Sequence, residues 1–254
     1  MTGWDDNTRP QVTAAVLAGG RGSRMGAQRP KQLLELAGRT ILEHSLATFC
    51  SSPDVDHVLV LSASSHIDET KRVVAHLADP KITAVLPGGA ERSDTSRCAI
   101  QALADRPDSD LLLLHDAARP LVEPAEIAAC VSAATATGAA SVAIPTSDTI
   151  VEAAPGPAST VPETVAHMPS RSGLRRMQTP QGFRLGTLRR AHDRAQADPH
   201  FQPTDDCGVV LRYLPETSVA LVAGTEHNIK ITHPGDIAIA AALLGRRTNQ
   251  EETT

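Results

Sequence analysis

Aromatic residues are scarce in this chain of 254 residues, which has three Phe, one Trp and one Tyr. Proteins that bind single-stranded nucleic acid stack the bases on aromatic rings, so this composition argues against that function. The formal net charge of -5 also leaves no global basic surface. The composition therefore predicts no nucleic-acid partner, and any phosphate site must be a local cluster of cations.

Metal-binding cysteine patterns and long apolar runs are also missing. None of the four cysteines forms a C-x-x-C pair or has a histidine at ligand spacing, so we interpret them as reduced side chains of a cytoplasmic protein. No apolar run approaches the ~20 residues that span a bilayer. The polar opening from Met1 to Pro10 does not resemble a signal peptide. These absences predict a cytoplasmic location and no membrane partner.

The order of apolar and amphipathic segments predicts one α/β domain. Strands are expected at 12–17, 57–62, 82–86, 110–114, 140–145 and 218–222, and helices at 66–78, 93–104 and 123–137. Further helix starts are expected at Thr40, with Glu43 completing a capping box, and at Thr204; Ser93 or Asp94 would cap the helix at 93–104. The expected fold is a doubly wound, mostly parallel, Rossmann-like sheet spanning residues 12–246, with flexible tails at 1–11 and 247–254.

Residues 146–184 interrupt the alternation of expected strands and helices, since they contain Pro/Ala/Gly loops and no convincing helix or core strand. A long irregular excursion inside a compact domain is usually functional or an interface. We interpret it as an arm that leaves the domain to pair with another subunit; a disordered surface insertion is the alternative.

A glycine-rich turn follows the first expected strand. Gly19, Gly20 and Gly22 are followed by the cations Arg24 and Lys31. Glycines allow backbone N–H groups to approach an anion closely, and fixed cations supply the opposite charge. The turn matches neither G-x-G-x-x-G nor the Walker A loop. It predicts a phosphate site, with a simple tight turn as the alternative.

Other candidate residues also lie where expected strands end. Asp116 follows a buried strand, where a carboxylate contacts a ligand or caps a helix, and Lys230 gains a role only if the fold brings it beside Lys31. His115 is interpreted as a structural histidine. No G-x-S-x-G nucleophile elbow is present, which disfavours a covalent acyl mechanism. Cations with few candidate bases are typical of phosphoryl or nucleotidyl transfer.

Taken in order, these segments resemble the 2-C-methyl-D-erythritol 4-phosphate cytidylyltransferases, a family of nucleotidyltransferases. The matching pieces are LAGGRGSRMGAQRPKQ, PGGAERSDT, LLHDAARP, IPTSDTI, SRSGL, MQTPQGF, TDDC and NIKITHPGD. They cover the chain from about Val12 to Leu244. The resemblance implies a nucleotidyltransferase sheet with a protruding β-arm, which transfers CMP from CTP to a small polyol phosphate with Mg²⁺.

The resemblance also implies roles for individual residues. The catalytic residues would be Arg24, Lys31, Arg171 and Lys230. The nucleotide would be bound by Ala18, Gly19, Gly20, Gly89, Ala90, Thr95 and Ala117. The polyol phosphate would be bound by Asp116, Arg119, Thr149, Thr179 and Thr204. No protein ligand for the metal is assigned.

Two points stay open within the resemblance. The opening Leu17-Ala18-Gly19-Gly20 is frequent in the related ribitol-5-phosphate cytidylyltransferases, whereas HDAARP and QTPQGF look like the methylerythritol enzymes. Methylerythritol phosphate is the favoured acceptor and ribitol phosphate the alternative. The resemblance further implies a homodimer with shared active sites, in which Arg171 and Thr179 on the arm complete the partner's site. A binding module without catalysis and a Rossmann dehydrogenase are the rival functions; the retained cations disfavour the first and the failed glycine fingerprint disfavours the second.

Overall fold

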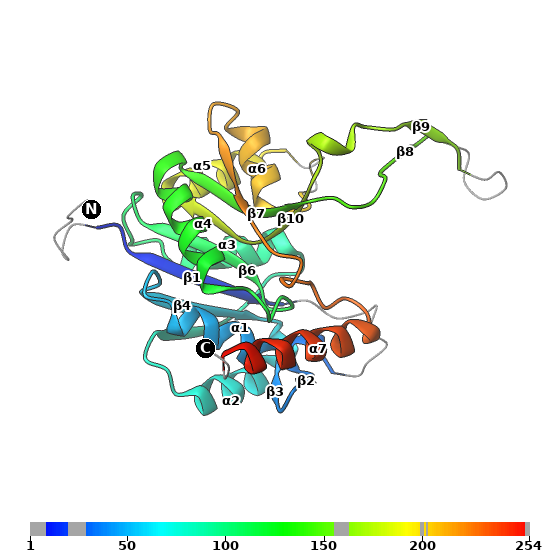
Figure 1. Cartoon of the computed structure of the whole chain (residues 1–254). Helices are drawn as coiled ribbons and strands as arrows, with labels where there is room; N and C mark the ends of the chain where they lie inside the picture. Colours follow the sequence, from blue (N-terminus) through cyan, green and yellow to red (C-terminus); the bar gives the residue numbers. More distant parts are fainter. Residues whose placement is uncertain (1–8, 20–28, 155–162, 199–200, 202, 252–254) are drawn as a thin grey trace.

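A seven-stranded mixed sheet forms the centre of the computed structural model (Figure 1), which describes residues 9–19, 29–154, 163–198, 201 and 203–251. The strand order is β11-β7-β10-β6-β1-β4-β5. The strands are β1 (Val12–Ala18), β4 (His57–Ser62), β5 (Ile82–Pro87), β6 (Leu111–Asp116), β7 (Ala139–Pro145), β10 (Arg175–Arg184) and β11 (Val219–Ala223). The predicted α/β fold with a mostly parallel sheet is confirmed, and six of these strands lie within two residues of their predicted bounds.

Strand β10 is the exception, because the sequence predicts no core strand between residues 146 and 184. It lies between β6 and β7 and runs antiparallel to both. Its sequence does not have the pattern of a core strand, because it is polar and contains Pro180 and Gly182. A proline normally argues against a central strand. The register shifts between Met177 and Gln181, so that the pairing with β7 is interrupted around Pro180. The prediction was therefore wrong for residues 175–184.

Helices cover both faces of the sheet. They are α1 (Ile41–Ser51), α2 (Ile67–Leu77), α3 (Arg92–Ala102), α4 (Pro124–Thr137), α5 (Leu185–Gln196), α6 (Asp206–Tyr213) and α7 (Pro234–Glu251). The hydrophobic clusters place α1, α2 and α4 on one face and α3, α5 and α6 on the other. The clusters thus confirm the doubly wound arrangement. Among the described residues, no helix is both long and apolar enough to cross a membrane.

Helix caps test the sequence interpretation in detail. The capping box of Thr40 and Glu43 at the start of α1 is confirmed. Helix α3 begins one residue earlier than predicted, because Glu91 is its N-cap and Asp94 is the third helical residue of a capping box. Helix α6 is capped by Asp205, whose side chain accepts a hydrogen bond from Gly208, and not by Thr204.

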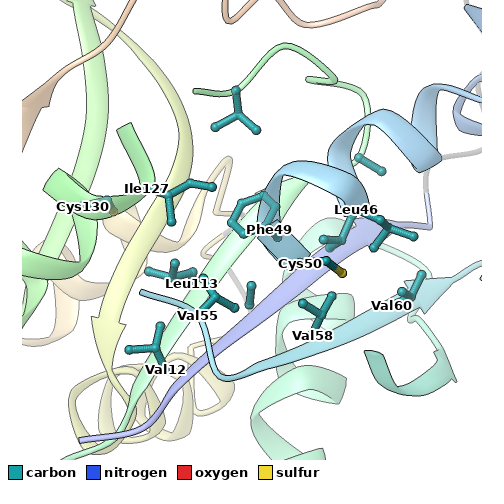
Figure 2. Packing of buried hydrophobic residues seen from close by; sticks show 14 of the residues in the cluster. Val12, Leu46, Phe49, Cys50, Val55, Val58, Val60, Leu113, Ile127 and Cys130 are labelled. Carbon is teal, nitrogen blue, oxygen red and sulfur yellow. The ribbon is translucent and has the colours of Figure 1, made fainter. Parts of the chain in front are cut away.

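Aliphatic side chains build most of the core, with the buried Phe49 on the face covered by α1 and α4 and the buried Phe183 on the other face. Figure 2 shows Phe49 of α1 among Leu46, Leu113 and Ile127. Its ring is fully buried and lies 4.8 Å from the ring of His115, centroid to centroid. Burial of such a side chain contributes about 2–3 kcal/mol to the free energy of unfolding. This packing fixes β1 and β6, whose carboxyl ends carry the candidate site.

Part of the predicted arm projects from the domain. Strands β8 (Glu152–Ala153) and β9 (Val165–His167) pair with each other and lie far from the central sheet (Figure 1). A 3₁₀ turn, η4 (Arg171–Gly173), leads back to β10. Residues 146–174 therefore contain the projecting segment, and residues 175–184 belong to the sheet.

The chain is described from Arg9 to Glu251 at its two ends, and residues 1–8 and 252–254 lie outside the described residues. Arg9 pairs with Asp56, and the amide of Gln11 donates to Asp110 at 3.0 Å. Helix α7 continues to Glu251. The flexibility of the two tails stays a prediction.

Candidate active site

A cavity of about 480 Å³ opens at the carboxyl ends of β1, β5 and β6. Ligands of doubly wound sheets bind at this edge, where successive strands end side by side. The cavity is lined by Leu17, Gly19, Lys31, Gln32, Gly89, Ala90, Glu91, Arg92, Thr95, Asp116, Ala117, Ala118 and Lys230. Three cations and two carboxylates thus surround one space.

The structure brings together eight of the predicted site residues on this cavity. They are Gly19, Lys31, Gly89, Ala90, Thr95, Asp116, Ala117 and Lys230. Ala18 is buried immediately before Gly19, and its carbonyl accepts a hydrogen bond from the Gln32 amide. Gly20 and Arg24 lie outside the described residues.

The turn after β5 has no space for a side chain at Gly89. A Cβ there would lie 2.1 Å from the Cβ of Asp94. The Thr95 hydroxyl accepts from the Gly89 amide at 3.1 Å and donates to the Glu91 carbonyl at 3.0 Å. Thr95 therefore fixes the loop that forms one wall of the cavity, and only glycine fits at 89.

Asp116 is held between two cations. Its Oδ2 atom lies 2.6 Å from the Lys230 ammonium, and its Oδ1 atom lies 3.5 Å from Nε of Arg92. Burial opposes the charge, but Lys230, Arg92 and Arg119 hold the pKa of this carboxyl well below its usual range. Asp116 is therefore ionised at neutral pH.

Lys31 and Lys230 line the same cavity although they come from opposite ends of the chain. The Lys31 ammonium donates to the carbonyl of Ile231 at 2.9 Å. The amide of Ile231 in turn donates to the carbonyl of Ala118 at 2.8 Å. The condition under which Lys230 gains a functional role is met, because the fold places it on the same cavity as Lys31.

Arg119 does not line the cavity but supports the segment that carries Lys230. Its guanidinium donates to the carbonyl of Asn228 at 2.7 Å and to that of Met177 at 3.3 Å. The fully buried Asn228 side chain donates to Glu126 at 3.2 Å and to the Thr179 carbonyl at 3.0 Å. This arrangement gives Arg119 an architectural role; its predicted contact with substrate stays a prediction.

Thr179 lies in the central sheet and not on the arm. Its hydroxyl accepts from the amide of Asp116 at 3.1 Å and bonds to Nδ1 of His115 at 3.0 Å. Nε2 of His115 lies 3.1 Å from the carbonyl of Arg119, which can only accept, so Nε2 carries the proton and Thr179 donates to Nδ1. The expectation that Thr179 reaches a partner's site was wrong, because its side chain is buried in its own subunit.

The interpretation of His115 as a structural histidine is confirmed. The ring is completely buried, and desolvation lowers its pKa from 6.5 to about 4. Both ring nitrogens have partners within the fold. His115 is neutral at physiological pH and holds the backbone on which Asp116 sits.

Three further predicted residues lie away from the cavity wall. Thr149 is exposed at the base of the projecting segment, and Arg171 lies in η4, where its guanidinium donates to the Ser147 carbonyl at 3.1 Å. Thr204 is exposed before the cap of α6. Within one chain these side chains do not meet Lys31 and Lys230 on the cavity wall.

Arg92, Glu91 and Gln32 line the cavity but are absent from the predicted site. Arg92 is the most consequential, since it joins Asp116 to the buried Asp206. The sequence places Arg92 at the start of a predicted helix, shortly after the glycines that end a predicted strand, and this position could have indicated a site residue. A lone arginine in a helical segment, however, is usually a solvated surface charge.

The described residues contain no cluster of three or more His, Cys, Asp or Glu side chains able to hold a metal ion. The carboxylates on the cavity are Glu91 and Asp116, and Asp116 is already paired with cations. Mg²⁺ commonly binds through substrate phosphates and water, with one or two carboxylates at most. This donor set therefore fits a metal that arrives on a polyphosphate and excludes a protein cage within the described residues.

A glycine-walled cavity with converging cations, at the strand ends of a doubly wound sheet, defines an α/β enzyme of the nucleotide- and phosphate-binding class. Residues 12–246 match the model of the 2-C-methyl-D-erythritol 4-phosphate cytidylyltransferase family, IspD. The chain belongs to this family. It is thus an enzyme of the cytidylyltransferase type.

Individual relatives support this assignment. A Thermobifida fusca protein named 2-C-methyl-D-erythritol 4-phosphate cytidylyltransferase is 56% identical over 93% of this chain and 94% of its own length. A Haemophilus influenzae protein named bifunctional ribulose 5-phosphate reductase/CDP-ribitol pyrophosphorylase is 39% identical over 92% of this chain, but only 48% of its own length. The crystal structure of 4-diphosphocytidyl-2C-methyl-D-erythritol synthase from Anaerococcus prevotii superposes with a TM-score of 0.78 at 26% identity, covering 93% of this chain and 96% of that one.

Proposed function

We propose that this enzyme transfers CMP from CTP to 2-C-methyl-D-erythritol 4-phosphate, a step of non-mevalonate isoprenoid biosynthesis. The products are 4-diphosphocytidyl-2-C-methyl-D-erythritol and pyrophosphate. The observation that carries the proposal is the convergence of Lys31, Lys230 and Asp116 on one glycine-walled cavity. The family assignment and the Thermobifida fusca relative supply the two substrates.

The chemistry is an in-line displacement at phosphorus. An oxygen of the acceptor phosphate forms a bond to the α-phosphorus of CTP, and the bond from that phosphorus to the pyrophosphate oxygen breaks. The acceptor oxygen is already anionic, so no general base is required. Positioning and charge stabilisation carry the reaction, as in other phosphoryl transfers.

Each cation has a proposed task. Lys31 and Arg24 stabilise the negative charge that grows on the triphosphate in the transition state. Lys230, fixed by Asp116, orients the acceptor phosphate, and Asp116 accepts hydrogen bonds from polyol hydroxyls. Gly19, Gly20, Gly89, Ala90, Thr95 and the segment around Ala117 form the nucleotide side. A Mg²⁺ ion that arrives with the CTP phosphates would add further charge neutralisation, and no protein ligand is assigned to it.

The working form in this proposal is a cytoplasmic homodimer. Five of the eight large exposed hydrophobic side chains in the described residues lie between residues 150 and 177, on or next to the projecting segment. Such clustering is typical of a protein interface. Arg171 on this segment then completes the acceptor site of the other subunit. Four unpaired cysteines suit a reducing compartment.

Ribitol 5-phosphate is the second candidate acceptor, favoured by the Haemophilus influenzae relative and by the opening Leu17-Ala18-Gly19-Gly20. Pyrophosphate release, measured with CTP and Mg²⁺ and each acceptor in parallel, separates the two. We expect turnover with methylerythritol phosphate and little with ribitol phosphate. Turnover with ribitol phosphate alone would show that the protein makes CDP-ribitol. No pyrophosphate release with either acceptor would contradict the proposal.

A further inference from the structure

A chain of polar and charged side chains runs from the cavity into the interior between α3, α5 and α6. It begins at Lys230 and Asp116, continues through Arg92, and ends at Asp206 and His192. Asp206 is completely buried, and its Oδ1 atom lies 3.0 Å from Nε2 of His192. The reaction as proposed above uses the first two members and assigns no role to the other three.

The guanidinium of Arg92 is the link in this chain. It pairs with Asp206 on the inner side, its Nη2 atom lies 3.4 Å from the side-chain oxygen Oε1 of Gln181, and its Nε atom faces Asp116 at 3.5 Å. The hydroxyl of Ser96 also donates to Asp206, at 3.1 Å. An arginine held on several sides by fixed acceptors keeps one orientation, because its planar donor fork fits them together.

A buried ion pair of this kind is a poor device for stability alone. Removing two charges from water costs several kcal/mol per ion, and well-packed apolar residues often replace such a pair without loss. The pair does, however, place a rigid cation against one oxygen of Asp116 while Lys230 occupies the other. Its position beside the reacting groups indicates a task in the reaction.

We propose that Arg92 is a positioning residue for Asp116 and Lys230, and that the buried Asp206–His192 pair anchors Arg92 for this task. The role rests on the proposed function, in that Asp116 and Lys230 receive the acceptor. With Arg92 in place, the Asp116 carboxylate cannot rotate, and its second oxygen stays on Lys230. Without Arg92 the carboxylate turns, and Lys230 loses its fixed direction toward the acceptor phosphate.

The charge balance around Asp116 gives a second consequence. The charged groups that face it are Lys230, Arg92 and Arg119, and the neighbouring His115 is neutral. Replacing Arg92 by a neutral residue removes one of the cations that keep the pKa of Asp116 low. The acidic limb of acceptor kcat/KM then moves to higher pH, an effect that a purely structural role would not produce.

Three single variants, one double variant and one control test the proposal. Arg92→Met removes the cation at similar length, Arg92→Lys keeps the charge without the fork, and Asp206→Asn removes the anchor's charge at constant shape. Arg97→Met is the control on the same helix, since Arg97 pairs with Asp94 at the surface. The double variant Arg92→Met/Asp206→Asn removes both charges, which guards against unfolding caused by an unpaired buried carboxylate.

We expect Arg92→Met to raise the acceptor KM by about tenfold or more, as for groups in one ion-pair network, with the Kd for CTP within about threefold of wild type. Arg92→Lys restores part of the loss, and Arg97→Met changes neither constant. Because Asp206 acts through Arg92, the double variant is no worse than Arg92→Met. An unchanged acceptor KM in Arg92→Met overturns the proposal, and so do losses that add in the double variant.

A measurement without substrate separates this proposal from the proposed function. The carbon-13 shift of the Asp116 carboxyl is followed from neutral pH to about pH 3. Protonation of the neighbouring His115, whose pKa is about 4, shifts this signal in all the proteins. We expect Arg97→Met to follow wild type and Arg92→Met to show a further bend at higher pH, from the carboxyl itself. If the wild-type enzyme transfers CMP to neither acceptor, the proposed function is wrong, and the titration alone tests the positioning role of Arg92. Identical titration curves for wild type, Arg97→Met and Arg92→Met would refute that role.

Discussion

At the scale of residues, two lysines from distant parts of the chain, Lys31 and Lys230, line one cavity. Lys31 follows Pro30 in a short 3₁₀ turn, and its ammonium donates to the carbonyl of Ile231, the residue after Lys230. An ammonium held in this way at a cavity wall can stabilise the negative charge of a bound phosphate in the transition state.

Lys31→Ala is predicted to lower turnover by about 10²–10³-fold, the loss typical of one preorganised donor to a transition-state charge. The unfolding midpoint in urea is expected to change little. Steady-state pyrophosphate release measures the first effect and equilibrium denaturation the second. Lys71→Ala, at an exposed position of α2, is the control and should match wild type in both. Retained turnover in Lys31→Ala would argue strongly against a transition-state role.

His115 makes stability depend on pH in a defined window. Its folded pKa of about 4 lies below the reference value of 6.5, so the unfolded chain takes up the proton first as the pH falls. Stability is thus complete above about pH 6.5 and is lost toward pH 4, by about 3 kcal/mol in total. We expect the free energy of unfolding of wild type to fall between pH 7.5 and 5.

His115→Gln removes this titration and should flatten that pH dependence, at some cost in stability at neutral pH. Glu126, whose pKa is raised by burial, acts in the opposite direction but is present in both proteins, so the comparison cancels it. Urea denaturation series at several pH values supply the measurement. Equal slopes for the two proteins would show that the imidazole is not the group that titrates.

At the scale of elements, the sequence predicts strands that follow apolar patterning and misses the one that does not. The six parallel strands are apolar runs between turn signals, a pattern that predicts buried strands of a parallel sheet. The buried half of β10 instead carries Gln178, Thr179 and Gln181, all at most 5% exposed. Each makes a hydrogen bond outside the strand: Thr179 with the Asp116 amide at the cavity, Gln178 with the carbonyl of Thr225, and Gln181 with the Asp205 carboxylate. Local patterning fails here because these buried polar side chains are explained by tertiary contacts, one of which fixes a residue of the candidate site.

The candidate site shows the same division. Positions at strand ends, such as Gly19, Gly89 and Asp116, are predictable because the carboxyl ends of parallel strands meet at one edge. The sequence predicts a role for Lys230 only on the condition that the fold brings it beside Lys31. Its position depends on a loop that the buried Asn228 holds in place. Arg92 was missed because its partners lie 24 and 114 residues away in the sequence. Contacts of this kind come from the tertiary fold and leave no periodic signal.

Gly182 tests the packing of β10. A Cβ at this position would lie 2.9 Å from a methyl carbon of Leu113, 3.0 Å from the sulfur of Cys130 and 3.1 Å from the Cβ of Ala134. Gly182→Ala is therefore predicted to destabilise the protein by about 1–3 kcal/mol, the usual cost of overpacking. Thermal and urea unfolding measure this change. Gly235→Ala is the matched control, because no atom lies within 4 Å of its added Cβ, and it should be neutral or slightly stabilising. Equal stabilities of the two variants would show that β10 packs more loosely than described.

At the scale of the whole molecule, the projecting segment is difficult to explain in a monomer. Strands β8 and β9 contact each other and have no part in the central sheet. An isolated two-stranded hairpin is marginal in water, and this one exposes Val165 at 59% and Met168 at 59% nearby. A second copy of the chain would bury these side chains and bring Arg171 to the other subunit's cavity.

Mixed dimers test this arrangement directly. Lys31→Ala and Arg171→Ala are each predicted to be nearly inactive as pure proteins, the first for lack of transition-state charge and the second for poor acceptor use. If Arg171 serves the partner's site, a mixed dimer contains one site with both residues intact and one site that lacks both. Random mixing then restores about one quarter of the wild-type activity per subunit, because half of the dimers are mixed and each has one working site. If Arg171 serves its own subunit, every site in the mixed dimer lacks one residue and mixing restores nothing. Light scattering on the same samples verifies that they are dimers, and a monomer at assay concentration would refute the shared site whatever the activity.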